Sequence, residues 1–148
     1  MSDGPILHTA SFADLDTHTL YALLRLRVDV FVVEQQCVYP ELDGRDLEPD
    51  TLHIWYEQAG APVAYLRVLA EPGGVARIGR VAVATEARGA GLARRLMRVA
   101  LDRIGDRPCE LHAQAYLADF YQQLGFSPTG PEFLDDGIPH VPMVRPAP

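Results

Sequence analysis

Lysine is absent from this chain of 148 residues, and all 13 of its basic side chains are arginines. A guanidinium group stays protonated, so it cannot replace the deprotonated amine or the compact ammonium of lysine. The absence excludes Schiff-base chemistry, lysine-dependent pyridoxal phosphate chemistry and phosphate loops of the Walker type. Several classes of enzyme are therefore excluded before any motif is considered.

Cysteine is scarce, and long hydrophobic runs are missing. Cys37 and Cys109 show neither metal-ligand nor disulfide-framework spacing, so we expect free thiols and no bound metal. No window approaches the roughly 20 apolar residues that span a bilayer, and residues 1–10 contain no basic, apolar leader. We expect one domain over residues 1–148 that acts in the cytoplasm without a membrane partner.

The arginines are unevenly distributed. Residues 77–107 hold eight arginines against three acidic residues, a local balance of +5, whereas the whole chain has a formal net charge of −7. A basic segment in an acidic protein indicates an anionic ligand that binds locally, whereas nucleic-acid binding favours a basic domain. We therefore expect no nucleic-acid partner.

Hydrophobic periodicity and turn residues predict strands and helices in an α+β order. Strands are expected over residues 6–11, 52–57, 63–71, 75–83 and 109–115, and helices over about 17–31, 92–104 and 117–124. Six of the 12 prolines lie at or after Pro128, which predicts short, edge-like or irregular strands there. A strand, helix and strand in succession imply a parallel pair appended to an antiparallel meander, and hence a mixed sheet.

A glycine loop between residues 81 and 94 is the most informative segment. A strand enters the loop and a helix begins after it, so free backbone N–H groups and the positive end of the helix dipole form an anion site. A dinucleotide fingerprint would need a small residue where Arg94 stands and a parallel strand before the loop. A plain structural turn is the alternative interpretation of the loop.

The loop resembles the R-x-x-G-x-G/A signature of the GNAT acyltransferase superfamily, matched by Arg88, Gly91 and Ala93. Residues 114–126 resemble the N-x-x-A-x-x-F-Y-x-x-x-G-F segment of the same superfamily, with Gln114 and Leu117 in place of its Asn and Ala. Residues 27–35, 43–46 and 136–140 are similar to segments of its ElaA-like subgroup. The resemblance covers nearly the whole chain and implies the GNAT fold, a mostly antiparallel mixed sheet with splayed central strands and flanking helices.

The same resemblance implies acetyl-CoA as a co-substrate in a V-shaped cleft between the splayed strands. The implied contacts are Val81, Ala82 and Val83 for the pantetheine, the loop Arg88, Gly89, Ala90, Gly91, Leu92, Ala93 and Arg94 for the pyrophosphate, and in addition Gln114 and Tyr121. Arg88, Arg94 and Arg95 are the cations expected nearest the phosphates. The arginines further along the helix are expected to be solvated.

Acyl transfer to an amine needs a neutral nucleophile, a polarised thioester carbonyl and a proton for the leaving thiolate. The resemblance assigns Tyr121 as the general acid and a backbone N–H near Val81 to the carbonyl. Glu34 and His140 are the two candidates for the general base. The structural alternatives are a core aromatic for Tyr121, a surface position or a salt bridge to Arg27 for Glu34, and a structural histidine for His140.

The sequence restricts the identity of the acceptor only through the charge of the residues expected near it. The acidic loop over residues 40–50 is either a solvated loop or a wall of the acceptor site, where it would attract a cationic amine. We expect an N-acetyltransferase that acts by direct attack in a ternary complex on a primary amine of a small molecule or protein. A non-catalytic acyl-CoA-binding or regulatory module of the same fold is the alternative, and a homodimer is compatible with either.

Overall fold

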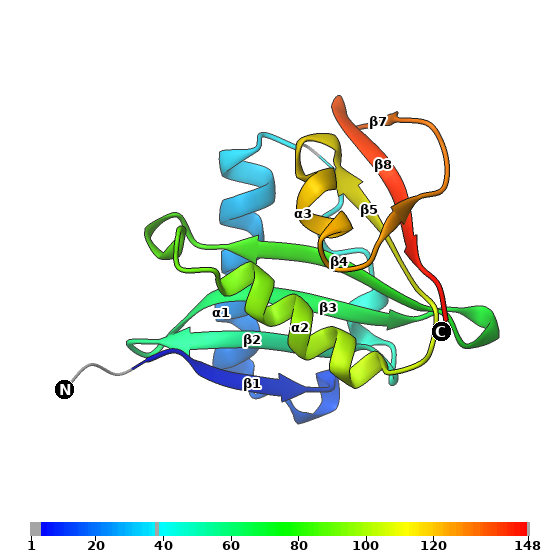
Figure 1. Ribbon diagram of the computed structural model, residues 1–148. Helices are drawn as coiled ribbons and strands as arrows, with labels where there is room; N and C mark the ends of the chain where they lie inside the picture. The colour runs from blue at the N-terminus through cyan, green and yellow to red at the C-terminus, as the bar shows by residue number, and fades with distance from the viewer. Residues whose placement is uncertain (1–3, 38, 148) are drawn as a thin grey trace.

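The computed structural model describes residues 4–37 and 39–147, and a mixed sheet lies at the centre of this part of the chain (Figure 1). Residues 1–3 and 148, the ends of the expected domain, lie outside the described residues. The strands are β1 (Ile6–Ala10), β2 (Leu52–Gln58), β3 (Ala61–Ala70), β4 (Ala76–Val83), β5 (Cys109–Gln114), β6 (Ser127–Pro128), β7 (Phe133–Asp135) and β8 (Ile138–Arg145). Their order is β1-β2-β3-β4-β5-β8-β6, and β7 pairs with β8.

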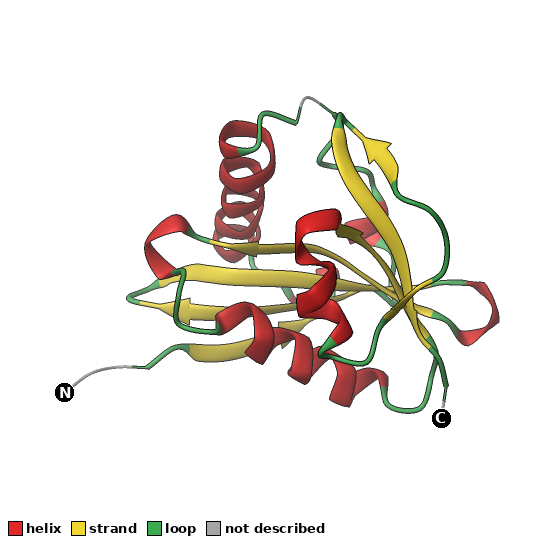
Figure 2. Ribbon diagram, turned by 45° about the horizontal axis from the view of Figure 1, so that its top comes forward, coloured by secondary structure: helices red, strands yellow, loops and turns green. Residues whose placement is uncertain are grey.

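Helices cover both faces of the sheet. The helices are α1 (Thr17–Arg27), α2 (Leu92–Ile104) and the short α3 (Ala118–Gln122). Figures 1 and 2 show α1 on one face and α2 on the other. The buried side chains of α2 are Leu92, Leu96, Met97, Ala100 and Ile104, and each contributes roughly 1 to 3 kcal/mol when removed from water. On the opposite face, Leu23 and Leu26 of α1 pack into a second cluster with Trp55 and Tyr65.

The expected topology is confirmed. Strands β1 to β4 form an antiparallel meander, and β4 and β5 are the parallel pair. The helix α2 has the bounds expected from its apolar spacing and ends at Gly105, whose φ is +66°. Asp16 caps α1, because its side chain accepts a hydrogen bond from the backbone N–H of Thr19 at 2.7 Å.

The first helix differs from its expected form. Regular α-helix ends at Arg27, and the chain continues as a π-helical segment, Val28–Glu34, closed by a hydrogen bond from the N–H of Gln35 to the carbonyl of Val30 (3.1 Å). Four valines occupy this segment, and β-branched side chains crowd the turn of a regular α-helix. Widened helical turns of this kind are frequent at functional sites.

The proline-rich C-terminal region is only partly as expected. β6 and β7 are short, but β8 has eight residues and pairs with β5 over six of them. Pro142 is tolerated because its carbonyl accepts a hydrogen bond from the N–H of Thr129 (2.9 Å), which needs no donor from the proline. Within residues 4–37 and 39–147, no helix combines the length and the apolar character that crossing a membrane requires.

Candidate active site

The parallel strands β4 and β5 are in contact at only one end. Their registered pairs are Ala76 with Cys109 and Arg77 with Glu110, after which the strands diverge (Figure 1). A cavity of about 630 Å³ occupies the gap. It is lined by both strands, by residues that follow α1, by α3 and by the turn between β7 and β8.

The cavity reaches both faces of the sheet. On the α2 face it is lined by Val81, Val83, Leu111 and Tyr121, which belong to or pack against the core beneath that helix. Along β5, His112 and Gln114 alternate with the buried Leu111 and Ala113, so they face the other way. Two molecules can therefore approach the gap from opposite faces of the sheet.

A β-bulge in β4 sets which side chains reach the gap. Arg67 pairs with Gly79 and Tyr65 with Ala82, so two residues, Arg80 and Val81, stand opposite a single residue of β3. Arg80 has a φ of +55°, a left-handed conformation that costs a non-glycine residue roughly 1 to 2 kcal/mol. The bulge turns Val81 towards the α2 core, and Val81, Ala82 and Val83, the residues expected beside pantetheine, all line the cavity.

The glycine loop opens α2 without a side-chain cap. Gly89 and Gly91 have φ values of +88° and +74°, and an added Cβ at either would meet nothing within 4 Å. Glycine is therefore needed here for the backbone conformation and not for space. Since Gly91 caps the helix without a side-chain hydrogen bond, the first N–H groups of α2 stay available for an acceptor.

The arginines expected beside this loop have protein partners. Arg88 donates two hydrogen bonds of 2.6 Å to the two carboxylate oxygens of Glu34. Arg94 donates to the side chain of Gln123 (2.9 Å) and lies over the ring of Phe120, and Arg95 lies over another aromatic ring. Among the described residues, Arg94 uses one of its nitrogens in a hydrogen bond and Arg95 none, so backbone and guanidinium N–H groups are both available at the start of α2.

Tyr121 lies in the gap on the α2 face. It is 6% exposed, and its ring contacts Phe120 and Phe126 edge to face at centroid distances of 5.0 and 6.2 Å. Burial raises the pKa of Tyr121 to about 12, so the hydroxyl is protonated at neutral pH. No hydrogen bond to this hydroxyl occurs within the described residues, and the side chain lines the cavity.

Glu34 is exposed and ion-paired. Its partner is Arg88. The alternative of a salt bridge to Arg27 is wrong, because Arg27 is 1% exposed and binds Glu41 and Asp46 at 2.8 Å each. The hydrogen bonds from Arg88 lower the pKa of Glu34 below its usual value. Glu34 is not among the described residues that line the cavity.

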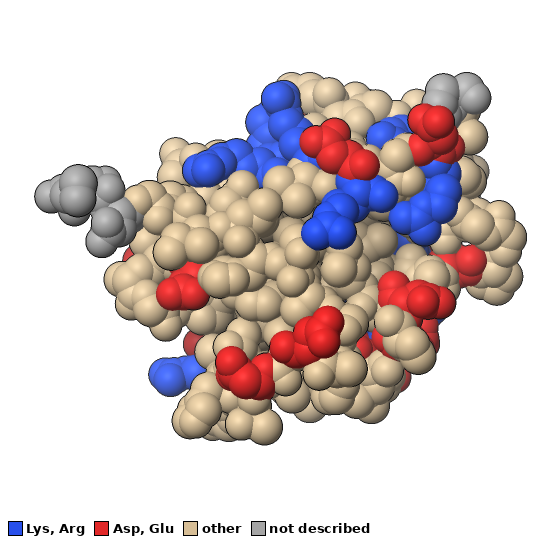
Figure 3. All heavy atoms as spheres, turned by 90° about the horizontal axis from the view of Figure 1, so that it is seen from below, with Lys and Arg blue, Asp and Glu red and all other residues tan. Residues whose placement is uncertain are grey.

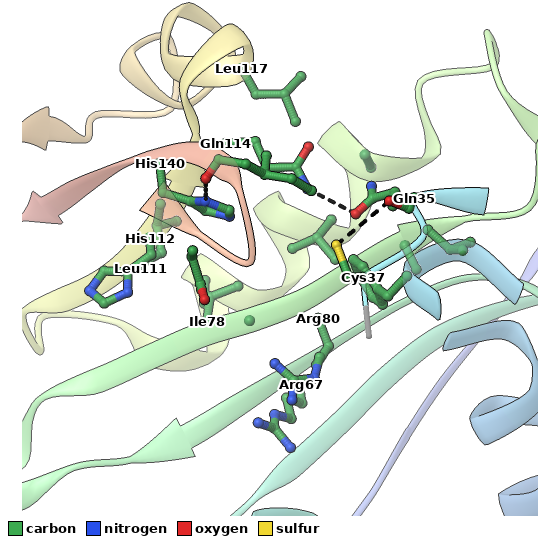
Figure 4. Close-up of a pocket in the computed structure, with 18 of the residues that line it drawn as sticks. Gln35, Cys37, Arg67, Ile78, Arg80, Leu111, His112, Gln114, Leu117 and His140 are labelled. Atoms are coloured by element: carbon green, nitrogen blue, oxygen red, sulfur yellow. Dashed lines mark hydrogen bonds between the residues drawn. The ribbon is translucent and has the colours of Figure 1, made fainter. Parts of the chain in front are cut away.

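His112, Gln114 and His140 share one wall of the cavity (Figure 4). Nδ1 of His140 lies 2.7 Å from the carbonyl of Ile138, and a carbonyl only accepts, so Nδ1 carries the proton and Nε2 has the free lone pair of the neutral ring. Gln114 donates to the side chain of Gln35 at 3.1 Å, which joins the two sides of the gap. His112 lies on the same face of β5 as Gln114, as alternation along a strand requires, and desolvation lowers its pKa.

A network of arginines and carboxylates lies beside the cavity, and sequence reasoning missed it. Arg27, Arg67 and Arg80 pair with Glu41, Asp43 and Asp46, and Arg45 and Arg77 pair with Glu48, Glu71 and Glu110. The acidic loop was expected to attract a cationic amine, but most of its carboxylates are bound to arginines. Arg77 and Arg80 were counted in the basic segment 77–107, and their ionic partners place them in this network. On the face of the molecule seen in Figure 3, arginines and acidic residues form separate groups.

Comparison with known proteins decides the family. The model of the acetyltransferase (GNAT) domain matches residues 23–146. The chain belongs to the GNAT acetyltransferase family. The expected resemblance and the expected fold class are both confirmed.

Several relatives of this GNAT protein cover nearly its full length. The UPF0039 protein Rv2851c of Mycobacterium tuberculosis is 56% identical over 137 residues, which are 90% of this chain and 88% of that protein. Protein ElaA of Escherichia coli is 42% identical over 139 residues, 90% of this chain and 91% of ElaA. The crystal structure of ElaA has a TM-score of 0.91, with 38% identity and coverage of 96% and 99%. An acyl-CoA N-acyltransferase from Pseudomonas aeruginosa has a TM-score of 0.89 and 43% identity, and covers 96% and 99%.

Proposed function

We propose that this GNAT protein transfers an acetyl group from acetyl-CoA to a primary amine by direct attack in a ternary complex. The observation that carries the proposal is the gap between β4 and β5, because Tyr121, an unpaired strand edge and an uncapped helix start adjoin one cavity open to both sheet faces. Membership of the GNAT family supports the binding of an acyl-CoA.

Backbone groups would hold acetyl-CoA. The edge of β4 beyond Arg77 has no registered partner on β5, so those of its N–H and C=O groups that point away from β3 could pair with the amides of pantetheine, as an added strand would. The carbonyl of Val83 would first have to release Nε of Arg88. The uncapped N–H groups of α2 suit the pyrophosphate, and the helix dipole favours its negative charge. Gln114, another expected contact, would first have to release Gln35.

The chemistry assigns one proton movement to each side of the gap. The amine nitrogen forms a bond to the thioester carbon, the carbon–sulfur bond breaks, and the sulfur receives hydrogen-bond donation, and finally a proton, from Tyr121. A backbone N–H near Val81 would polarise the carbonyl. The attacking nitrogen loses its proton to a base on the acceptor face.

His140 is better suited to be that base than Glu34. Its Nε2 is free to accept a proton, and the residue lines the cavity. Glu34 lies outside the cavity lining, and its lowered pKa makes the carboxylate a weaker base. Both remain testable by substitution.

Acetyl-CoA binding and thiol release test the function separately. We expect acetyl-CoA to raise the unfolding temperature of the purified protein, and we expect free thiol to form when a primary amine is added. Binding without thiol release across a broad amine panel would support the non-catalytic module instead. No thermal shift at millimolar acetyl-CoA would refute both interpretations.

A further inference from the structure

The side of the cavity opposite the α2 core is lined by more charge than acetyl transfer requires. Arg45, Arg67, Arg77 and Arg80 line it, and we call these four residues the arginine wall. The Arg67 side chain is only 4% exposed and that of Arg80 18%. Burying charged groups carries a desolvation cost that an apolar cluster would avoid. Stability of the fold is therefore an insufficient reason for the wall.

The carboxylates beside the arginine wall already accept hydrogen bonds from its guanidinium groups. Asp43 accepts hydrogen bonds of 2.6 and 2.9 Å from Arg67 and lies 3.5 Å from Arg80. Glu71 is shared between Arg45 and Arg77. An ammonium group of a substrate would have to displace one of these arginines to reach a carboxylate here.

The unused hydrogen-bonding capacity of the wall consists of donors. Nε of Arg67 is buried and has no acceptor among the described residues. Nη1 of Arg77 and Nη1 of Arg80 also form no hydrogen bond with any of the described residues. Guanidinium N–H groups match the two oxygens of a carboxylate in charge and geometry. These unused N–H groups are therefore complementary to a carboxylate.

Another part of the cavity lining offers acceptors. Asp135, the last residue of β7, and Asp136, in the turn before β8, line the cavity, are exposed, and form no ion pair within residues 4–37 and 39–147. His140, with its free Nε2, lies on the next strand. Donors on one wall and acceptors on the other favour a molecule that carries both a carboxylate and an amine.

We propose that the acceptor is a small amino acid, with its carboxylate on the arginine wall and its amine directed towards His140 and the thioester. This proposal rests on the acetyltransferase function proposed above. The lysine side chain of a protein has no carboxylate beside its amine, so it would leave the donors of the wall unpaired.

The test measures acetyl transfer to matched acceptors. The purified 148-residue protein is incubated with acetyl-CoA and one acceptor at a time, and the release of free thiol is recorded. The acceptors are the standard L-amino acids, β-alanine and 4-aminobutyrate. Each amino acid is compared with its carboxamide and with its decarboxylated amine. For the best acceptor we expect kcat/KM to exceed that of its carboxamide about 10-fold to 100-fold, as the loss of a charge-assisted hydrogen bond implies. A peptide with an internal lysine and an amidated C-terminus tests protein acceptors.

Three variants separate recognition from folding. Arg77→Gln should lower kcat/KM for the amino acid about 10-fold and leave the carboxamide within about 3-fold, while Arg77→Lys, which keeps the charge, should recover part of the preference. Arg98→Gln is the matched control, because Arg98 is an exposed arginine of α2 outside the cavity. The thermal shift with acetyl-CoA verifies that each variant folds.

The outcomes distinguish the two proposals. Equal or faster acetylation of carboxamides, decarboxylated amines or the peptide would overturn the amino acid proposal and leave the acetyltransferase function standing. Equal losses for acid and carboxamide in Arg77→Gln would also overturn it, since a purely structural role predicts that result. Binding of acetyl-CoA without acetylation of any amine would overturn both.

Discussion

Replacing Tyr121 with phenylalanine removes one oxygen atom from the gap between β4 and β5 and leaves the ring. The ring keeps its edge contacts with Phe120 and Phe126. Because the hydroxyl has no hydrogen-bond partner among the described residues, its removal should change the free energy of unfolding by less than about 1 kcal/mol. Tyr121→Ala would instead lose the ring and cost roughly 3 to 5 kcal/mol.

The effect on turnover follows from the acidity of the phenol. Its pKa is about 12, whereas the pKa of an alkyl thiol is about 8.5. Complete proton transfer from the phenol to the thiolate therefore has an unfavourable free energy. The phenol would therefore act mainly by donating a hydrogen bond to the sulfur as charge develops. Loss of one such donor lowers kcat about 10²-fold to 10³-fold, and we expect Tyr121→Phe to fall in that range.

The assay is thiol release at saturating acetyl-CoA and amine, together with the thermal shift caused by acetyl-CoA. We expect kcat to fall while the thermal shift is retained, because in the proposed complex backbone groups, and not the Tyr121 hydroxyl, bind acetyl-CoA. A folded Tyr121→Phe protein whose kcat stays within about twofold of the unmodified protein would refute the assigned role.

Three further predictions concern the other titratable groups. Glu34→Gln should leave kcat within about fivefold, because Glu34 acts as an exposed partner of Arg88; a loss of 100-fold or more in thiol release would identify it as the base. His140→Gln should lower kcat about 10²-fold or more, whereas the exposed His18→Gln should not, and equal activity of both in a pH series would exclude His140. Burial lowers the pKa of His53, so the unfolded chain binds the proton more tightly than the folded protein does. The contribution of His53 to stability should therefore be constant above about pH 6.5 and decrease as the pH falls below it. Thermal unfolding between pH 5 and 8 should show a flatter pH profile for His53→Gln, and an unchanged slope would contradict this.

The glycine loop and α2 could be predicted because their signals are local. The positive φ values at Gly89 and Gly91 require glycine, and the apolar positions of α2 recur at helical spacing. The divergence of β4 and β5 was expected only through the family resemblance, because no residue pattern within either strand specifies it. The order of helices and strands could therefore be predicted from periodicity, whereas the gap between β4 and β5 could be predicted only from the motifs shared with the family.

The arginine wall could not be predicted for two physical reasons. The bulge at Arg80 places a non-glycine residue at positive φ, and it shifts the alternation of β4 without any marker in the sequence. The ion pairs of Arg67 join residues 21 and 24 positions apart, so counting charges along the chain does not bring these partners together. The ionic partner of Glu34 was missed for the same reason, because Arg88 lies 54 positions away.

The limited contact between β4 and β5 affects the cooperativity of the protein as well as its chemistry. Two registered residue pairs, assisted by the bond between Gln35 and Gln114, connect the meander to the sheet formed by β5 and β8. A molecule that binds both strand edges would act as an additional strand and couple the two parts. Occupancy of the gap would then slow amide hydrogen exchange in β5 and β8 together, so the co-substrate would serve as a structural component of the folded protein.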